Sequence, residues 1–124
     1  MELARHEDVR AAFIGPVSNP GPYISQASMV FSSGYLSMLE AMAFHRPVFS
    51  VFHTPVKFDY LKQMSGAGVL FSISSSPEQL ASEVMSHLSK NNNELTQIER
   101  AYDFAAQHSW SRLAGNYIEL WNQN

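Results

Sequence analysis

Short apolar runs alternate with longer amphipathic segments along this chain. Four runs have the length of buried strands, bounded by Gly, Pro or Ser: Ala11 to Val17, Ser28 to Ser33, Pro47 to Phe52 and Ala67 to Ile73. Continuous apolar runs of this kind are typical of strands that are covered on both faces. The Pro/Gly-rich loop after the first run leaves room for one helical turn around Ile24 to Ala27.

Helices are predicted between and after the later runs. Tyr35 to His45 is rich in Leu, Met and Ala, and Pro47 ends it because a residue before proline avoids helical angles. Thr54 precedes Pro55 as an N-cap of the next helix. Ser76 and Gln79 form a capping box that predicts another helix. Two more helices are predicted after the "KNNN" break, at Glu94 to Gln107 and Trp110 to Asn122.

This order of elements predicts one α/β domain over residues 1–124, with a C-terminal helical tail. We expect a Rossmann-like parallel sheet of about four strands, with helices on both faces. The last helix carries an apolar stripe at helical spacing, made of Trp110, Leu113, Tyr117, Leu120 and Trp121. We expect this tail to pack on another domain or another chain, and unmatched sheet edges make self-association a further expectation.

Composition narrows the classes of function. The 124 residues are 45% apolar and 15% charged, with a net charge of -3 and scattered Lys and Arg, so no nucleic-acid partner is expected. The absence of cysteine suits a cytoplasmic location. No apolar run approaches the roughly 20 residues that cross a bilayer, so we expect no integral membrane segment.

Histidines do not form a predicted metal site. The five histidines, none of which pairs with another at a spacing of four residues, are His6, His45, His53, His87 and His108. No nucleophile and base stand in a recognisable arrangement either. We therefore predict no metal and no cofactor, and the catalytic residues are left open.

The turn before Tyr35 is the best candidate site. Ser33 and Gly34 lie at the carboxyl end of a predicted strand, where ligands bind in open parallel sheets. The first N–H groups of the following helix lack internal partners and favour an anion. Main-chain amides of Gly34, Tyr35 and Leu36, with the hydroxyls of Ser33 and Ser37, are predicted to hold phosphate oxygens.

Glu40 is the single carboxylate in the run from Phe31 to Ser50. Ser33, Ser37 and Glu40 fall on one predicted helical stripe, and helical side chains lean toward the N-terminus. A carboxylate there could accept hydrogen bonds from a sugar diol. The alternative is that this stripe is only the solvated edge of the helix.

The stretch "SSGYLSMLEAMAFHRPVFSVF" resembles the nucleotide-sugar-binding domain of retaining glycosyltransferases with the GT-B fold. The end of the chain, "FAAQHSWSRLAGNYIELW", is similar to the closing segment of that family. The resemblance implies that Glu40 binds the ribose hydroxyls of a nucleotide-sugar donor. It also implies a diphosphate site at Gly34, Tyr35, Leu36 and Ser37, and a nucleobase contact at Gly15, Pro16 and Val17.

The chain departs from the family pattern. Ser32 stands where the family has its first acid, which contacts the transferred sugar. The amino-terminal acceptor domain and the first strand–helix units of the family also have no counterpart in this sequence. The resemblance therefore implies a partial domain that is inactive alone and needs the missing N-terminal domain or a partner chain.

Two residues after the third predicted strand complete the candidate set. His53 and Lys57 lie near the same edge and would contact the sugar or phosphates of the donor, although solvated surface is the alternative for Lys57. In this interpretation helix amides and cations stabilise the diphosphate. The rival hypotheses are a non-catalytic nucleotide-binding or protein-interaction module, and a flavodoxin-like signalling domain.

Overall fold

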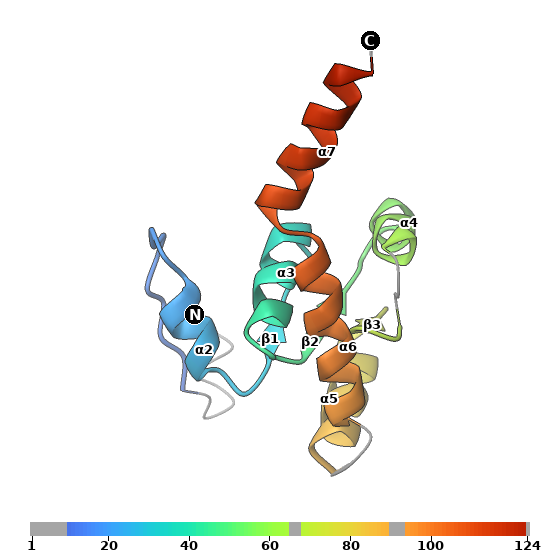
Figure 1. Ribbon diagram of the computed structural model, residues 1–124. Helices are drawn as coiled ribbons and strands as arrows, with labels where there is room; N and C mark the ends of the chain where they lie inside the picture. Colours follow the sequence, from blue (N-terminus) through green and yellow to red (C-terminus); the bar gives the residue numbers. More distant parts are fainter. Residues whose placement is uncertain (1–9, 65–67, 90–93, 124) are drawn as a thin grey trace.

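The computed structural model of this chain describes residues 10–64, 68–89 and 94–123. Its sheet has three parallel strands in the order β1 (Val30–Phe31), β2 (Val48–Val51) and β3 (Ser72–Ser74). Val30 pairs with Val48 across the first ladder, and Phe49 pairs with Ser72 across the second. Helices follow the strands in sequence, as Figure 1 shows. The chain is therefore an α/β protein with a parallel sheet.

The helices begin and end close to the predicted positions. Their bounds are α2 (Gly21–Gln26), α3 (Tyr35–Ala43), α4 (Pro55–Gln63), α5 (Pro77–Ser89), α6 (Glu94–Gln107) and α7 (Trp110–Asn122). Both predicted caps are confirmed, because the Thr54 hydroxyl accepts from Lys57 N–H and the Ser76 hydroxyl accepts from Gln79 N–H. Local capping chemistry therefore sets where α4 and α5 begin.

Two strand predictions differ from the structure. Ala11 to Val17 is wrong as a strand, because it has no regular structure and Phe13 and Ile14 are 72% and 54% exposed. An apolar run becomes a strand only beside a partner, and no described segment pairs with the outer edge of β1. For the run from Ala67 to Ile73, Ala67 lies outside the described residues and β3 begins only at Ser72. The described sheet therefore has three strands, not about four.

The core lies where α3 meets β2 and α6. Met38 and Met42 of α3 are fully buried, and they share the core with Val48 of β2. Ala101 and Ala105 of α6 are also buried there, and such small side chains let a neighbouring helix approach closely. The buried face of α3 fixes this helix against the sheet, while Leu36 and Glu40 remain exposed.

Two serine hydroxyls are buried in the sheet. Ser50 of β2 and Ser74 of β3 are 1% and 0% exposed, and no described residue forms a hydrogen bond with either hydroxyl. A buried hydroxyl without a partner has lost its hydration without compensation, at a cost of about 1–3 kcal/mol.

We predict that Ser74→Ala raises the free energy of unfolding by about 1 kcal/mol, because it removes this uncompensated group. Urea denaturation monitored by circular dichroism measures the change. Ser75→Ala is the matched control with the opposite sign, since the Ser75 hydroxyl donates to Gln79 Oε1 at 2.8 Å. A loss of stability in Ser74→Ala would contradict the assignment of Ser74 as an unsatisfied group.

Candidate functional site

The turn between β1 and α3 is closed by a ring of hydrogen bonds. The Ser37 hydroxyl donates to the Gly34 carbonyl at 3.0 Å, and Gly34 N–H donates to Ser32 Oγ at 3.3 Å. The two hydroxyl oxygens, Ser32 Oγ and Ser37 Oγ, lie 2.6 Å apart. Because the Ser37 proton is already used, the Ser32 hydroxyl is the donor between them. The ring fixes the path of the backbone into α3.

Gly34 leaves little space for a side chain in this ring. Its backbone is extended, with a φ of -93°, so no left-handed conformation demands glycine. A Cβ at this position would lie 3.1 Å from Ser37 Oγ. That distance is shorter than ordinary van der Waals contact, so the Ser37 hydroxyl would have to shift by a few tenths of an ångström to admit a Cβ.

The first N–H groups of α3 have no partner among the described residues. The first helical hydrogen bond runs from Met38 N–H to the Gly34 carbonyl. No described residue accepts from the N–H groups of Tyr35, Leu36 or Ser37. Gly34 N–H, which was also a predicted phosphate donor, is partly engaged by Ser32 Oγ. Three N–H groups and the positive end of the helix dipole therefore remain for an anion.

Lys57 reaches this turn from α4. Its ammonium donates a hydrogen bond to the Ser33 carbonyl, and Nζ also lies 4.5 Å from the centre of the Tyr60 ring. The side chain is half-buried. No ion pair links Lys57 to a carboxylate of the described residues. The structure thus brings a cation to the predicted site, next to the positive end of α3.

Glu40 lies one to two turns further along α3. Its side chain is exposed and borders a groove of about 640 Å³ between α3, α6 and the start of α7. We call this the α3–α6–α7 groove; its lining includes Leu36, Leu39, Glu40, Tyr102, Trp110 and Leu113. The predicted stripe of Ser33, Ser37 and Glu40 is not formed as expected, because Ser33 lies outside α3 and contributes its carbonyl instead.

Ser32 is the residue that sequence reasoning missed. In the sequence, Ser32 stands out only as a departure from the family pattern, yet its hydroxyl joins the ring that shapes the turn. The available signal was local: serines near a helix start often bond neighbouring backbone groups. Two consecutive serines before a glycine gave that signal here.

The remaining candidate residues make no contact with the turn that the structure shows. Gly15, Pro16 and Val17 lie in an exposed segment without regular structure. His53 is exposed between β2 and α4, and no hydrogen bond or ion pair of its side chain is recorded among the described residues. Their contacts with a donor stay predictions.

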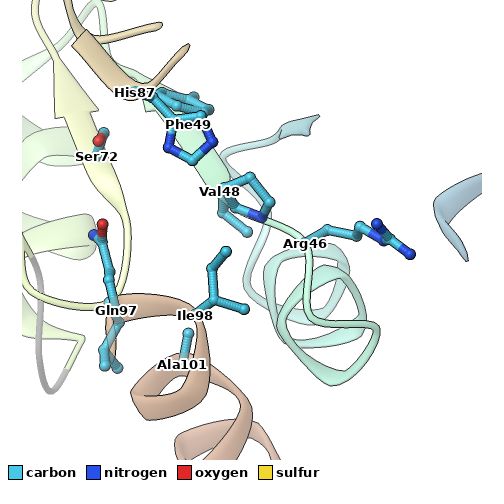
Figure 2. A pocket seen from close by; sticks show the side chains of 10 residues that line it. Arg46, Val48, Phe49, Ser72, His87, Gln97, Ile98 and Ala101 are labelled. Atoms are coloured by element: carbon cyan, nitrogen blue, oxygen red, sulfur yellow. The ribbon is translucent and has the colours of Figure 1, made fainter. Parts of the chain in front are cut away.

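A second cavity, lined by residues of β2, β3, α5 and α6, is too small for a nucleotide sugar. Figure 2 shows Ile98 and Ala101 of α6 facing Val48 of β2 around it. Its volume is about 10 Å³, and a single water needs about 10–15 Å³. Among the described residues, no cluster of three His, Asp or Glu side chains has the geometry to hold a metal ion. In the same residues, no helix has the length and apolarity to span a membrane.

Comparison of the chain with protein-family models, curated proteins and solved structures gives no match. The residues and geometry of the turn therefore carry the functional argument, together with the sequence resemblance.

The ring at the turn makes a testable prediction. Gly34→Ala should lower the free energy of unfolding by about 1 kcal/mol, because the added Cβ displaces the Ser37 hydroxyl. In a Ser37→Ala background the same change should cost almost nothing, since the clashing oxygen is gone. A double-mutant cycle by urea denaturation measures this coupling, and strictly additive effects would contradict the ring.

Proposed function

We propose that this chain is the donor-binding part of a GT-B-type retaining glycosyltransferase and that it holds a nucleotide-diphosphate sugar. In this proposal the domain is Rossmann-like, with helices on both faces of the sheet, and works in the cytoplasm. The acceptor is presented by a separate N-terminal domain or a partner chain, so the chain alone does not catalyse transfer.

One observation carries the proposal. The ammonium group of Lys57 donates to the Ser33 carbonyl, two to four residues before three backbone N–H groups from which no described residue accepts a hydrogen bond. A helix N-terminus disfavours a neighbouring cation by about 0.3–1 kcal/mol unless an anion lies between them. A diphosphate supplies that anion. It would accept from Tyr35, Leu36 and Ser37 N–H and from the two ammonium protons that Ser33 does not use.

The same geometry supports a role in leaving-group stabilisation. During glycosyl transfer, negative charge develops on the departing diphosphate. Preorganised donors aimed at that charge lower the barrier, because they need no reorganisation during the reaction. The backbone N–H groups of α3 are held in place by the hydroxyl ring, and Lys57 is held by the Ser33 carbonyl.

Glu40 is assigned to the ribose of the donor. Its exposed carboxylate borders a groove of about 640 Å³, which leaves room for a sugar ring beside it. A carboxylate can accept from both hydroxyls of a diol. The position is compatible with a ligand whose phosphates lie at the start of the same helix. His53 and the segment from Gly15 to Val17 are further proposed contacts, to the sugar and the nucleobase.

A second candidate function is a nucleotide-binding module without transfer chemistry. Ser32 favours it, because this residue stands where the resembled family has its sugar-contacting acid and its hydroxyl is bound inside the turn. This candidate predicts binding of a nucleoside diphosphate with no turnover of a nucleotide sugar, even when an acceptor domain is supplied.

The proposal predicts that Lys57→Ala weakens the affinity for uridine or guanosine diphosphate by roughly 10- to 100-fold. This loss corresponds to about 1.5–3 kcal/mol for a hydrogen bond to a charged group. Isothermal titration calorimetry measures the affinity. Lys62→Ala is the matched control, since Lys62 lies exposed on the same helix and is not placed at the turn.

Two ligand changes separate the assigned roles. Glu40→Gln should weaken binding of the ribose diphosphate but have little effect on the 2′-deoxy analogue. Lys57→Ala should have little effect on the nucleoside without phosphates. If Lys57→Ala and Lys62→Ala bind the diphosphates equally well, the diphosphate site is elsewhere.

A further inference from the structure

The last helix has an apolar face that nothing in the described structure covers. In Figure 1, α7 projects away from the sheet and the other helices. Apart from the half-buried Gly115, every described residue of α7 is exposed. Trp110, Tyr117 and Trp121 are 72%, 63% and 84% exposed, an unusual state for three large aromatic side chains on one helix.

The apolar positions of α7 follow the spacing of a paired helix. Trp110, Ala114, Tyr117 and Trp121 are separated by four, three and four residues, which is the a/d spacing of a coiled coil. The polar side chains fall on the opposite side: Arg112, Asn116, Glu119 and Asn122. Leu113, Ile118 and Leu120 flank this seam, and such an apolar face with a solvated back is the pattern of a helix that packs against protein.

We infer that α7 pairs with α7 of a second copy of this chain, in an antiparallel orientation. Antiparallel pairing places a positions against d positions, so Trp110 faces Trp121 of the second copy and Ala114 faces Tyr117 of the second copy. A small side chain then lies opposite a large one in the two central layers. The pairing of a small with a large side chain follows from the sequence of α7, and a two-fold axis between the copies makes the same contact occur twice.

The start of α7 lies at the α3–α6–α7 groove. Trp110 and Leu113 form part of the wall of the α3–α6–α7 groove. Trp121 of the second copy pairs with Trp110 and so lies at the α7 end of this groove, whereas Glu40 borders the groove from α3. The pairing therefore covers the helix seam.

The area available is that of a stable dimer. Aromatic side chains bury about 150–250 Å² each, so six rings from two copies supply on the order of 1,000 Å². The flanking Leu113, Ile118 and Leu120 side chains, 44–61% exposed, add to this total. A specific interface with good complementarity buries at least about 1,000 Å², and the area of the two helices is of this order. This inference does not depend on the proposed nucleotide site.

Sedimentation equilibrium of the full chain tests the pairing. We expect a dimer, and we expect Trp121→Glu to raise the dimer dissociation constant roughly 30-fold or more, because a charge replaces an aromatic contact in each of the two end layers. Asn122→Glu is the matched control on the solvated side and should leave the constant unchanged. Circular dichroism establishes that both variants remain folded. A monomer at all concentrations up to about 1 mM, or equal effects of the two variants, would overturn the inference.

Tryptophan fluorescence supplies a second readout. Both tryptophans of the chain lie in α7, so the emission spectrum reports on this helix alone. Dilution through the dimer dissociation constant should shift the emission to longer wavelength as the indoles enter water. An unchanged spectrum while the mass falls from dimer to monomer would show that another surface makes the dimer.

Orientation is tested by single cysteines, since the natural chain has none. Ser111 and Ile118 flank the seam on the same side, and antiparallel pairing brings residue 111 of one copy beside residue 118 of the other. A mixture of Ser111→Cys and Ile118→Cys chains should therefore form a mixed disulfide, whereas neither variant alone should cross-link. Failure of a dimer of the two chains to form the mixed disulfide would contradict the antiparallel pairing.

Discussion

Lys57 places a positive charge beside the positive end of α3, and the proposed site depends on this arrangement. The ammonium is held by the Ser33 carbonyl and the Tyr60 ring, and no described carboxylate pairs with it. Burial of Met38 and Met42 anchors α3 to the sheet, so this helix cannot easily turn its amino terminus away. The ammonium of Lys57 and the positive end of the α3 dipole have the same sign, so an anion between them is stabilising.

Local chemistry explains why much of the fold was predictable from the sequence. Pro47, Thr54 and Ser76 mark element boundaries through interactions within a few residues, and α4 and α5 begin where these residues predict. The run from Ala11 to Val17 has the apolar pattern of a buried strand but is not a strand. A strand needs a partner across the ladder, and no pattern within seven residues encodes whether that partner is present.

The candidate site was predictable as a place but not as a set of contacts. The turn at Gly34 and the start of α3 follow from sequence, because a glycine between a strand and a helix is a local feature. The approach of Lys57 to Ser33 joins residues 24 positions apart and depends on how α4 packs. The hydroxyl of Ser32 joins the ring at the turn, whereas the hydroxyl of Ser33 was the predicted one. The direction of each side chain decides this, and spacing alone does not determine that direction.

The most direct test of the central claim is to observe the backbone amides of α3 during a titration with uridine diphosphate. A ¹H–¹⁵N spectrum of the chain reports each N–H group separately. If the turn is an anion site, the signals of Tyr35, Leu36 and Ser37 move and saturate, while those of α5, which packs on β2 and β3, stay in place. If these three signals are unmoved at about 1 mM ligand, where even weak binding is visible, the turn does not hold phosphate.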